Sequence, residues 1–383
     1  MALTLPLDDL EKIKSVDKDS MCKIQVEMPE FCEEAVKIAE KLKIPDSIKI
    51  SKSISITYKK PRKIVIAGVG GSAVGGDLLR TWLNYDLETP IIVSRNYHLP
   101  AYADHETLVF VVSYSGNTEE TLSSFIEAVQ RGCMIVGISS DGQLQTFCQK
   151  LKIPFIKLPA EIAPRTAIPY LFFPMVIALE KFRILKNKRS EINEAICILK
   201  RLREEIRPEI PTPKNIAKQV AFQLKGTIPV IYGFGPFESV AMRMKTQFNE
   251  NSKIPAKYEV FPELSHNELV GWEGHVEFTN QFSILLIRDP DESQEIKVRI
   301  DATKKLLKGK VGEILELYVM GEMTLAKMLS AMYIGDFASL YLAILYNVDP
   351  TPVASIMEMK ETLRRETNTT AKVEEQLRKL IEG

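Results

Sequence analysis

Residues 63–83 read "KIVIAGVGGSAVGGDLLRTWL", a short β-branched strand, a glycine-rich turn and a helix in immediate succession. β-Branched residues favour strands, and the glycines allow the backbone to turn tightly where the strand ends. Strand-like and helical runs then alternate along the chain, at 90–96 and 107–118 (strands), 119–132 (helix), and 133–140 and 154–159 (strands). This alternation predicts an α/β fold with a parallel sheet and helices on both of its faces.

The same strand, turn and helix recur in the second half of the chain, as "TIPVIYGFGPFESVAMRMKTQF" at 227–248. Gly233 and Gly235 of this copy each lie 165 residues after their counterparts, Gly68 and Gly70. We therefore predict two similar α/β domains in tandem, each with a parallel sheet.

Domain boundaries follow from the segments between and around these copies. The stretch "EIRPEIPTPKN" at 205–215 has three prolines in a polar setting, which is typical of a linker. We assign residues 61–206 to the first domain and residues 214–383, with the C-terminal helices, to the second. Residues 1–60 carry apolar positions at helical spacing, and we expect a helical segment packed on the first domain.

Composition limits the partners of this 383-residue chain, in which 45% of the residues are apolar and 26% are charged. This balance is typical of a soluble globular protein. Its 50 basic and 50 acidic side chains give zero formal net charge, so no global field favours nucleic acid or an anionic membrane. The cysteines form no C-x-x-C pair, the start is acidic, and no apolar run reaches about 20 residues, which together indicate a cytoplasmic protein.

Three hydroxyl side chains crowd the end of one apolar strand, in "VSYSGNTEET" at 112–121: Ser113, Ser115 and Thr118. In an open parallel sheet, ligands sit outside the carboxyl ends of the strands, where helix N-termini direct N–H groups toward them. Hydroxyls and N–H groups at this edge, with Gly116 allowing the turn, predict a phosphate monoester site that needs no lysine. The alternative is that Ser113 and Thr118 only cap the next helix, whose dipole two glutamates complement.

The glycine-rich turn at 68–76 adds a further hydroxyl, Ser72, at the same predicted edge. This turn also fits G-x-G-x-x-A, a dinucleotide-binding pattern. The strand "IIVSRN" does not end in the carboxylate that NAD sites need, so NAD is disfavoured and Arg95 alone keeps NADP open. The second copy carries Pro236 and Phe237 at the positions corresponding to the first turn, so only the first domain is expected to bind the anion.

Five motifs, in order along the chain, carry a family resemblance: "GVGGSAVGGD", "SYSGNTEET", "APRTAIPY", "NENSKIPA" and "ELSHNE". Over roughly residues 60–365 they resemble the sugar isomerase (SIS) family and, within it, the archaeal-type bifunctional phosphoglucose/phosphomannose isomerases. The resemblance implies a homodimer of two flavodoxin-like SIS domains that interconverts glucose and mannose 6-phosphates with fructose 6-phosphate through a cis-enediolate, with neither metal nor cofactor. It also implies a set of phosphate-binding residues: Gly71, Ser72, Ser113, Ser115 and Thr118.

The resemblance assigns catalytic roles to further residues. Glu250 becomes the base that moves a proton between C2 and C1, for which desolvation at the end of an apolar helix would suit it. His266 becomes the ring-opening acid/base, contributed to the neighbouring subunit's active site. Arg165 stabilises the enediolate, and Lys360, about two turns along a helix and directed inward, is a second ring-opening acid/base. Thr351 is a candidate for positioning a water. Without the resemblance, a surface role is favoured for Glu250 and His266, and a surface or salt-bridge role is about as likely as a catalytic one for Arg165.

Three other functions stay open at this point. The isomerase half of a glucosamine phosphate synthase would need a glutaminase with an N-terminal cysteine, whereas this chain begins Met1, Ala2. A sugar-phosphate sensor would be expected to add a basic helix-turn-helix, which the sequence does not suggest. An NADP-linked oxidoreductase is the third alternative.

Overall fold

The computed structural model describes residues 5–160, 162–367 and 369–382. These residues divide into two compact units, which we name after their strands. The β3–β7 unit comprises residues 30–188 and 353–382, and the β8–β11 unit comprises residues 5–29 and 189–352, within the described ranges. Each unit contains one parallel sheet with helices, so the predicted α/β class and the parallel sheets are confirmed.

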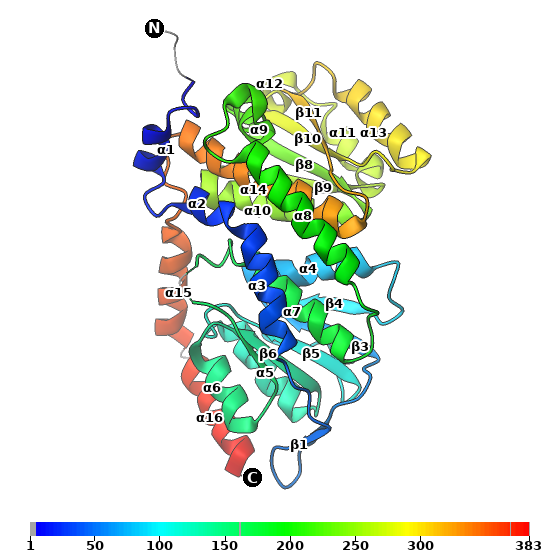
Figure 1. Ribbon diagram of the computed structural model, residues 1–383, viewed down its shortest axis with the longest axis vertical. Helices are drawn as coiled ribbons and strands as arrows, with labels where there is room; N and C mark the ends of the chain where they lie inside the picture. The colour runs from blue at the N-terminus through cyan, green and yellow to red at the C-terminus, as the bar shows by residue number, and fades with distance from the viewer. Residues whose placement is uncertain (1–4, 161, 368, 383) are drawn as a thin grey trace. The chain divides into compact units, whose positions relative to one another are not determined.

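The sheet of the β3–β7 unit has the strand order β4-β3-β5-β6-β7, and every neighbouring pair is parallel (Figure 1). In chain order this is 2-1-3-4-5, the flavodoxin-like order, which reverses direction between the first and third strands. The strands are β3 (Lys63–Ala67), β4 (Ile91–Ser94), β5 (Thr107–Val112), β6 (Met134–Ser139) and β7 (Phe155–Lys157). The crevice that binds ligands in such folds therefore opens where β3 and β5 end.

Helices cover this sheet because its central strands are apolar on both faces. Every residue of β5 and β6 is buried, as expected for continuous apolar runs in a parallel sheet. The apolar run at 170–179 lies in α7 and is buried, as the sequence predicts. The helices of this unit are α3 (Met28–Glu40, from Glu30 on), α4 (Gly71–Leu83), α5 (Glu119–Gln130), α6 (Gly142–Leu151), α7 (Ile168–Lys181), α15 (Ala354–Thr367) and α16 (Thr369–Glu382).

The sheet of the β8–β11 unit repeats this order. Its strands run β9-β8-β10-β11, or 2-1-3-4 in chain order, and every neighbouring pair is parallel. Gly70 and Gly235, at corresponding turns, have φ of 58° and 49°, the left-handed region that glycine tolerates best. The predicted internal repeat is thus visible in the folded chain. Its strands are β8 (Ile228–Phe234), β9 (Lys257–Phe261), β10 (Phe282–Arg288) and β11 (Ile314–Tyr318).

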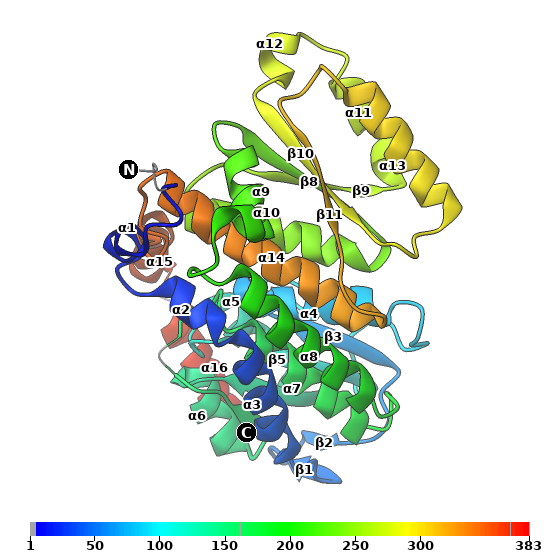
Figure 2. The ribbon, with the colours of Figure 1, turned by 45° about the horizontal axis from the view of Figure 1, so that its top comes forward.

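A long apolar helix, α14 (Thr324–Leu345), forms the core of this unit. It packs against α8, α9 and α10, and Figure 2 shows it alongside α9 and α10 on one side of the sheet, with α13 on the other. By length and composition α14 could span a membrane, but its apolar window is entirely buried in the fold, as in the core helix of a globular protein. The remaining helices are α1 (Leu10–Val16), α2 (Met21–Val26), α8 (Arg189–Ile206), α9 (Ile216–Leu224), α10 (Glu238–Ser252), α11 (Glu268–Gly271), α12 (Val276–Thr279), α13 (Gln294–Leu307) and the short 3₁₀ turns η1 (Thr212–Lys214), η2 (Gly235–Phe237) and η3 (Glu263–His266).

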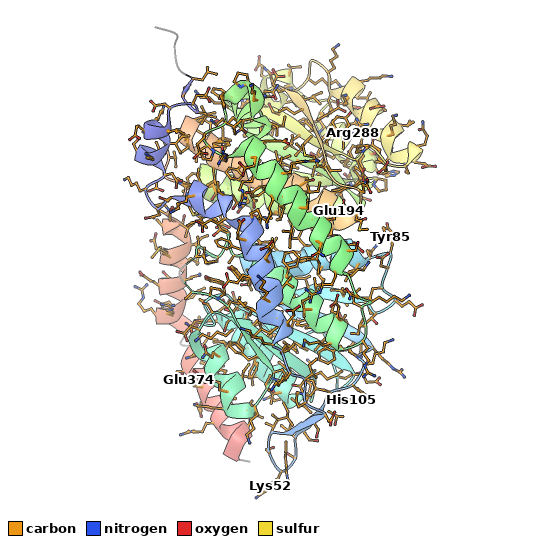
Figure 3. The ribbon with its side chains drawn as sticks, viewed as in Figure 1. Lys52, Tyr85, His105, Glu194, Arg288 and Glu374 are labelled. Carbon is orange, nitrogen blue, oxygen red and sulfur yellow. The ribbon has the colours of Figure 1, made fainter. Side chains whose placement is uncertain are left out.

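A polar contact adds to the packing of α8 on α14. The carboxylate of Glu194, which Figure 3 labels on α8, accepts hydrogen bonds from the backbone N–H groups of Glu322 at 2.6 Å and Met323 at 3.1 Å. These two residues directly precede α14, where the first N–H groups of a helix lack intrahelical partners. Glu194 therefore ties the start of α14 to α8.

The compact units do not follow the predicted domain ranges. Residues 5–29 belong to the β8–β11 unit, where the Asp8 carboxylate accepts hydrogen bonds from Thr212 and Lys218. Helix α8 also belongs there because it packs along α14. Conversely, the C-terminal helices lie in the β3–β7 unit, where α16 packs on α5 and runs beside α6 (Figure 1).

The N-terminal segment is helical only in part. Helices α1, α2 and α3 follow the prediction, but β1 (Ser47–Lys49) and β2 (Ser55–Thr57) form an antiparallel pair within it. Ile48 and Ile56 are buried between exposed neighbours, so these two short strands alternate polar and apolar residues. In a segment of only three residues, polar and apolar alternation cannot be distinguished in the sequence from the pattern of a helix.

Candidate active site

Two loops meet where β3 and β5 end. The Ser72 hydroxyl, in the first turn of α4, accepts a hydrogen bond of 3.1 Å from the backbone N–H of Tyr114. In the loop after β5, the hydroxyl oxygens of Ser113 and Thr118 lie 2.9 Å apart, and the N–H of Thr118 approaches Ser113 Oγ at 3.4 Å. Three of the predicted phosphate-binding hydroxyls therefore lie in loops that contact each other in one unit.

The conformation of the 113–118 loop depends on one glycine. Gly116 has a φ of 69°, and a Cβ atom there would lie 1.7 Å from the backbone oxygen of Asp141. The side chain of Asn117 secures the same approach, since its Oδ1 accepts from the N–H of Gln143 at 3.0 Å. The loop is thus folded tightly onto the start of α6, with Ser115 exposed and Ser113 fully buried.

Two helices begin at this edge without side-chain caps. Gly70 precedes α4 and Thr118 precedes α5, and among the described residues neither position makes a side-chain capping hydrogen bond. Thr118 is the N-cap residue of α5 but makes no side-chain capping bond, so the capping alternative is wrong for its hydroxyl. It holds in part for Ser113, whose Oγ accepts from the Thr118 N–H, and Glu119 and Glu120 do lie in the first turn of α5. Because the first N–H groups of a helix lack intrahelical partners, both helix starts can donate to an anion.

The segment that contains Arg165 packs against the first turn. A Cβ atom at Gly71 would lie 3.2 Å from the backbone oxygen of Pro164 and 3.8 Å from the Cα of Arg165. Arg165 is only 5% exposed. The structure therefore brings the "APRT" motif to the glycine-rich turn, and it gives the glycine at position 71 a packing reason besides its predicted backbone contact with phosphate.

Residues that the sequence did not single out support these loops. Tyr114 links them through its N–H, and its backbone oxygen accepts from the Ser140 hydroxyl at 2.6 Å. Its phenol donates to the backbone oxygen of Pro159 at 2.9 Å and accepts from the N–H of Ile162 at 3.2 Å. The sequence could have indicated Ser140, because this residue directly follows β6, the strand next to β5 in the sheet.

The other predicted catalytic residues lie elsewhere in the chain. Glu250 is half-buried in the last turn of α10, and His266 is exposed at the end of η3, both in the β8–β11 unit. Lys360 is exposed on α15 of the β3–β7 unit. The predicted inward orientation of Lys360 is not observed, because α15 buries none of its side chains within its described range.

Arg95, the residue that kept NADP binding open, already has an anionic partner. It follows β4 and forms an ion pair with Asp77 on α4. The Asp77 side chain is 5% exposed, so the guanidinium is held by a buried carboxylate. A 2′-phosphate would have to compete with this pair, which further weakens the dinucleotide interpretation.

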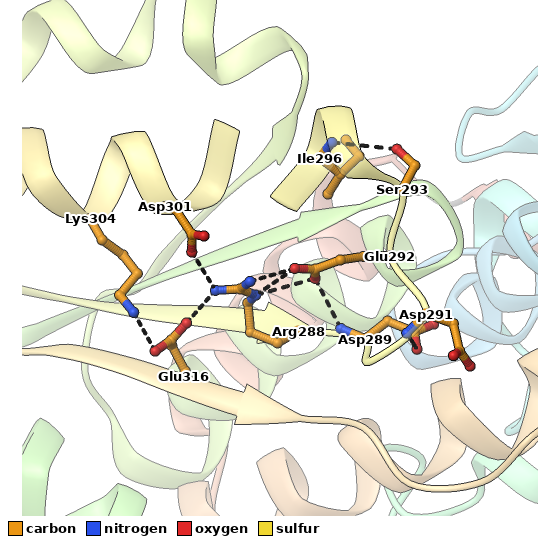
Figure 4. A network of polar contacts seen from close by, with 9 residues as sticks. All are labelled: Arg288, Asp289, Asp291, Glu292, Ser293, Ile296, Asp301, Lys304 and Glu316. Atoms are coloured by element: carbon orange, nitrogen blue, oxygen red, sulfur yellow. Dashed lines mark hydrogen bonds and ion pairs between the residues drawn. The ribbon is translucent and has the colours of Figure 1, made fainter. Parts of the chain in front are cut away.

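Charged side chains surround the end of β10 in the second sheet (Figure 4), whereas hydroxyls follow β5 in the first. Arg288, the last residue of β10, pairs with Glu292, Asp301 and Glu316. The N–H of Asp289 donates to the Glu292 carboxylate at 3.2 Å. Carboxylates therefore already occupy these donors at the end of β10. That only the first domain binds the anion stays a prediction.

Known proteins with similar sequences identify the family. The protein-family model described as "SIS domain" matches residues 57–161. The family model described as "Bacterial phospho-glucose isomerase C-terminal SIS domain" matches residues 213–363. A "Bifunctional phosphoglucose/phosphomannose isomerase" from Caldicellulosiruptor bescii is 42% identical over 86% of this chain and 98% of that protein. The chain belongs to this family of SIS isomerases. A relative of the same name from Aquifex aeolicus is 34% identical over 79% of this chain and 90% of its own length.

A solved structure agrees with the family in its fold. The "glucose-6-phosphate isomerase like protein" from Thermus thermophilus has a TM-score of 0.59 at 18% identity, covering 93% of this chain and 98% of that one. At this identity the likeness concerns the fold alone. The resemblance read from the five motifs is confirmed, and the chain is an isomerase with two SIS domains.

Proposed function

We propose that this protein is a metal-independent aldose–ketose isomerase that interconverts glucose 6-phosphate and mannose 6-phosphate with fructose 6-phosphate. The names of the two relatives support both activities. The observation that carries the proposal is the contact between Ser72 and the loop of Ser113 and Thr118, at the switch point of a flavodoxin-like sheet. Ligands of such folds bind at this point.

The phosphate of the substrate would bind at this edge. Its oxygens would accept hydrogen bonds from Ser72, Ser113, Ser115 and Thr118, and from N–H groups at the starts of α4 and α5. Charge-assisted hydrogen bonds of this kind are stronger than neutral ones. Binding the unreactive phosphate in this way holds the distant C1 and C2 atoms in place for the reaction.

Proton transfer at the other end of the sugar is assigned to Glu250. Its carboxylate would take the proton from C2 of the open-chain aldose, giving a cis-enediolate, and return it to C1 to give the ketose. The negative charge that develops on the enediolate oxygens needs a fixed cation, which the buried Arg165 is suited to supply. The family motifs around both residues support these roles.

Ring opening needs an acid/base near the ring oxygen and the C1 hydroxyl. We assign it to His266 and Lys360, and we place His266 in the active site of the partner subunit of a homodimer. Both side chains are exposed, so neither is buried within its own unit. Thr351 is assigned the positioning of a water beside the sugar.

Activity on both aldoses follows from the shared intermediate. The two aldose phosphates differ only at C2, and that difference disappears when C2 becomes planar in the enediolate. A site that lets the chain rotate about the C2–C3 bond can return the proton to either face. The same enzyme would then act on both epimers, in the cytoplasm where we expect it.

The test is to incubate the purified chain with fructose 6-phosphate and EDTA, without cofactor, and to assay glucose 6-phosphate and mannose 6-phosphate separately. Both products, lost in Glu250→Gln, would support the proposal. Glucose 6-phosphate alone would reduce the specificity to one aldose. Neither product, with fructose 6-phosphate still bound, would favour a sugar-phosphate sensor or a different SIS activity.

A further inference from the structure

The C-terminal turn of α10, which carries Glu250, is attached to α14 by buried polar contacts. Asn251 Nδ2 donates to the Ser339 hydroxyl at 2.9 Å, and the Ser252 hydroxyl donates to the backbone oxygen of Ser339 at 2.6 Å. All three side chains are at most 2% exposed. One residue of α14 therefore receives two hydrogen bonds from the two residues that follow Glu250.

The direction of these bonds is defined by a third contact. The Ser339 hydroxyl donates its own proton to the backbone oxygen of Asp336 at 2.7 Å. The lone pairs of the Ser339 oxygen are then available to Asn251, so the Ser339 hydroxyl both donates and accepts a hydrogen bond. Just over two turns earlier along α10, Arg243 donates to the Asp336 carboxylate at 2.8 Å, and Gln25 of α2 donates to the same oxygen at 3.1 Å. These contacts define the register of α10 on α14.

The remaining neighbours of Glu250 also hold the backbone. Asn249 Oδ1 accepts from the N–H of Ala256 at 3.1 Å, which secures the segment after the helix. Lys253, with a φ of 55°, ends α10, and its ammonium group donates to the backbone oxygens of Glu250 and Pro350. Every neighbour of Glu250 in the "NENSK" motif thus has a contact that holds the end of α10.

We propose that Asn251 and Ser252, acting through Ser339, are positioning residues for Glu250. The inference deepens the proposed function and rests on Glu250 being its base. Helix ends fray, and a base displaced by about 1 Å can lose about 100-fold in rate. The contacts with Ser339 prevent this displacement at the last turn, where the helix has no following turn to hold it.

The test compares two serine variants of the same helix. Ser339→Ala removes the hydroxyl that Asn251 contacts, while the bond from Ser252 to the backbone oxygen of Ser339 remains. Ser330→Ala removes an equally buried hydroxyl, which donates to the backbone oxygen of Lys327 and accepts from the N–H of Met320. The two serines lie about 13 Å apart along α14, given a rise of 1.5 Å per residue. We expect kcat to fall about 10- to 100-fold in Ser339→Ala, with KM for fructose 6-phosphate within about twofold of the native value. Ser330→Ala should keep kcat within about twofold.

Two further measurements separate positioning from general destabilisation. Thermal unfolding should show similar losses for both serine variants, and the acid limb of the kcat–pH profile should move only in Ser339→Ala. If Ser339→Ala does not fold, Ser252→Ala, which removes a single hydrogen bond, replaces it. The effects of Asn251→Ala and Ser339→Ala should not add, because both remove the same contact.

The outcomes distinguish this inference from the proposed function. If Glu250→Gln is inactive but Ser339→Ala and Ser252→Ala turn over like the native protein, Asn251 and Ser252 do not position the base and the inference is wrong. If Glu250→Gln remains active, the assignment of the base fails, and the inference with it. A fall in kcat that is equal in Ser339→Ala and Ser330→Ala would also overturn it.

Discussion

Ser113 and Thr118 hydrogen-bond to each other across the loop that follows β5, with their hydroxyl oxygens 2.9 Å apart. One hydroxyl directly follows a fully buried strand and the other directly precedes α5, so the contact closes the loop. Each hydroxyl keeps lone pairs and a rotatable proton. In the proposed phosphate site, the partly exposed Thr118 hydroxyl would meet the ligand directly, whereas the fully buried Ser113 hydroxyl would first have to turn outward.

Ser113→Ala should weaken phosphate binding. We expect kcat/KM for fructose 6-phosphate to fall about 10- to 100-fold, mainly through KM, since a hydrogen bond to a charged group is worth about 1.5–3 kcal/mol. Inhibition by inorganic phosphate should weaken in parallel. Ser124→Ala is the matched control, because this hydroxyl of α5 is equally buried but donates to the backbone oxygen of Asn96. Equal losses in the two variants would contradict a phosphate role for Ser113.

Gly116→Ala should destabilise the protein more than Gly132→Ala does. The two glycines have φ of 69° and 65°, so the cost of the left-handed conformation, about 1–2 kcal/mol, is shared. Only at Gly116 would the new methyl group collide with a backbone oxygen, 1.7 Å away, whereas the nearest atom at Gly132 is at 3.8 Å. Urea unfolding should show several kcal/mol of additional loss for Gly116→Ala. Equal midpoints would mean that the loop can move away from α6 at little cost.

Mixing two inactive variants tests the proposed role of His266 in the partner subunit. Glu250→Gln and His266→Ala homodimers would each lack one group in both active sites. After subunit exchange, a mixed dimer has one site that lacks both groups and one that is intact, if His266 acts across the interface. Activity should then recover to about a quarter of the native value, as expected from random pairing in a twofold dimer. No recovery in demonstrably mixed dimers would place His266 in its own subunit's site.

The sheets could be predicted because their signals are local. Runs such as 107–112 and 134–139 are apolar at nearly every position, and glycine turns with a 165-residue spacing reveal the repeat. The assignment of flanking helices to units could not be predicted in this way. Helix α8 packs on α14, and α16 packs on α5, through contacts between residues far apart in sequence. An amphipathic pattern predicts that one face of a helix is buried, but it does not identify the element that buries it.

The candidate site shows the same division. Ser72, Ser113 and Thr118 could be predicted, because the parallel topology brings the ends of β3 and β5 to one edge. The contacts of Tyr114 in the hydroxyl loops, and those of Ser339 at the end of α10, could not be predicted, because buried tyrosines and serines occur throughout the chain without a distinctive spacing. The helix that carries Lys360 was predicted, but the exposure of the Lys360 side chain on that helix was not.

Asp8 is the carboxylate partner of a buried lysine, which gives the N-terminal segment a testable role. The side chain of Lys218 is fully buried, and its ammonium group lies 3.1 Å from Asp8 and 2.8 Å from the backbone oxygen of Pro208. Asp8→Asn should lower the free energy of unfolding at pH 7 by about 3 kcal/mol, because it leaves a buried charge without its counter-ion. Replacing Lys218 with methionine in the same chain should restore most of this loss, and failure to do so would contradict the pairing.

Acid should remove the contribution of Asp8. Burial by itself would raise the pKa of the Asp8 carboxyl, but hydrogen bonds from Thr212 and Lys218 outweigh it and hold that pKa below its usual value. A lowered folded-state pKa stabilises the protein above the unfolded-state value of about 3.9 and loses that effect as the pH falls through the folded-state value. The difference in unfolding free energy between the native protein and Asp8→Asn should therefore be constant near neutral pH and shrink below about pH 4. Urea titrations of both proteins from pH 7 to pH 3 measure this difference, and a gap that widened toward acid would contradict the direction of the shift.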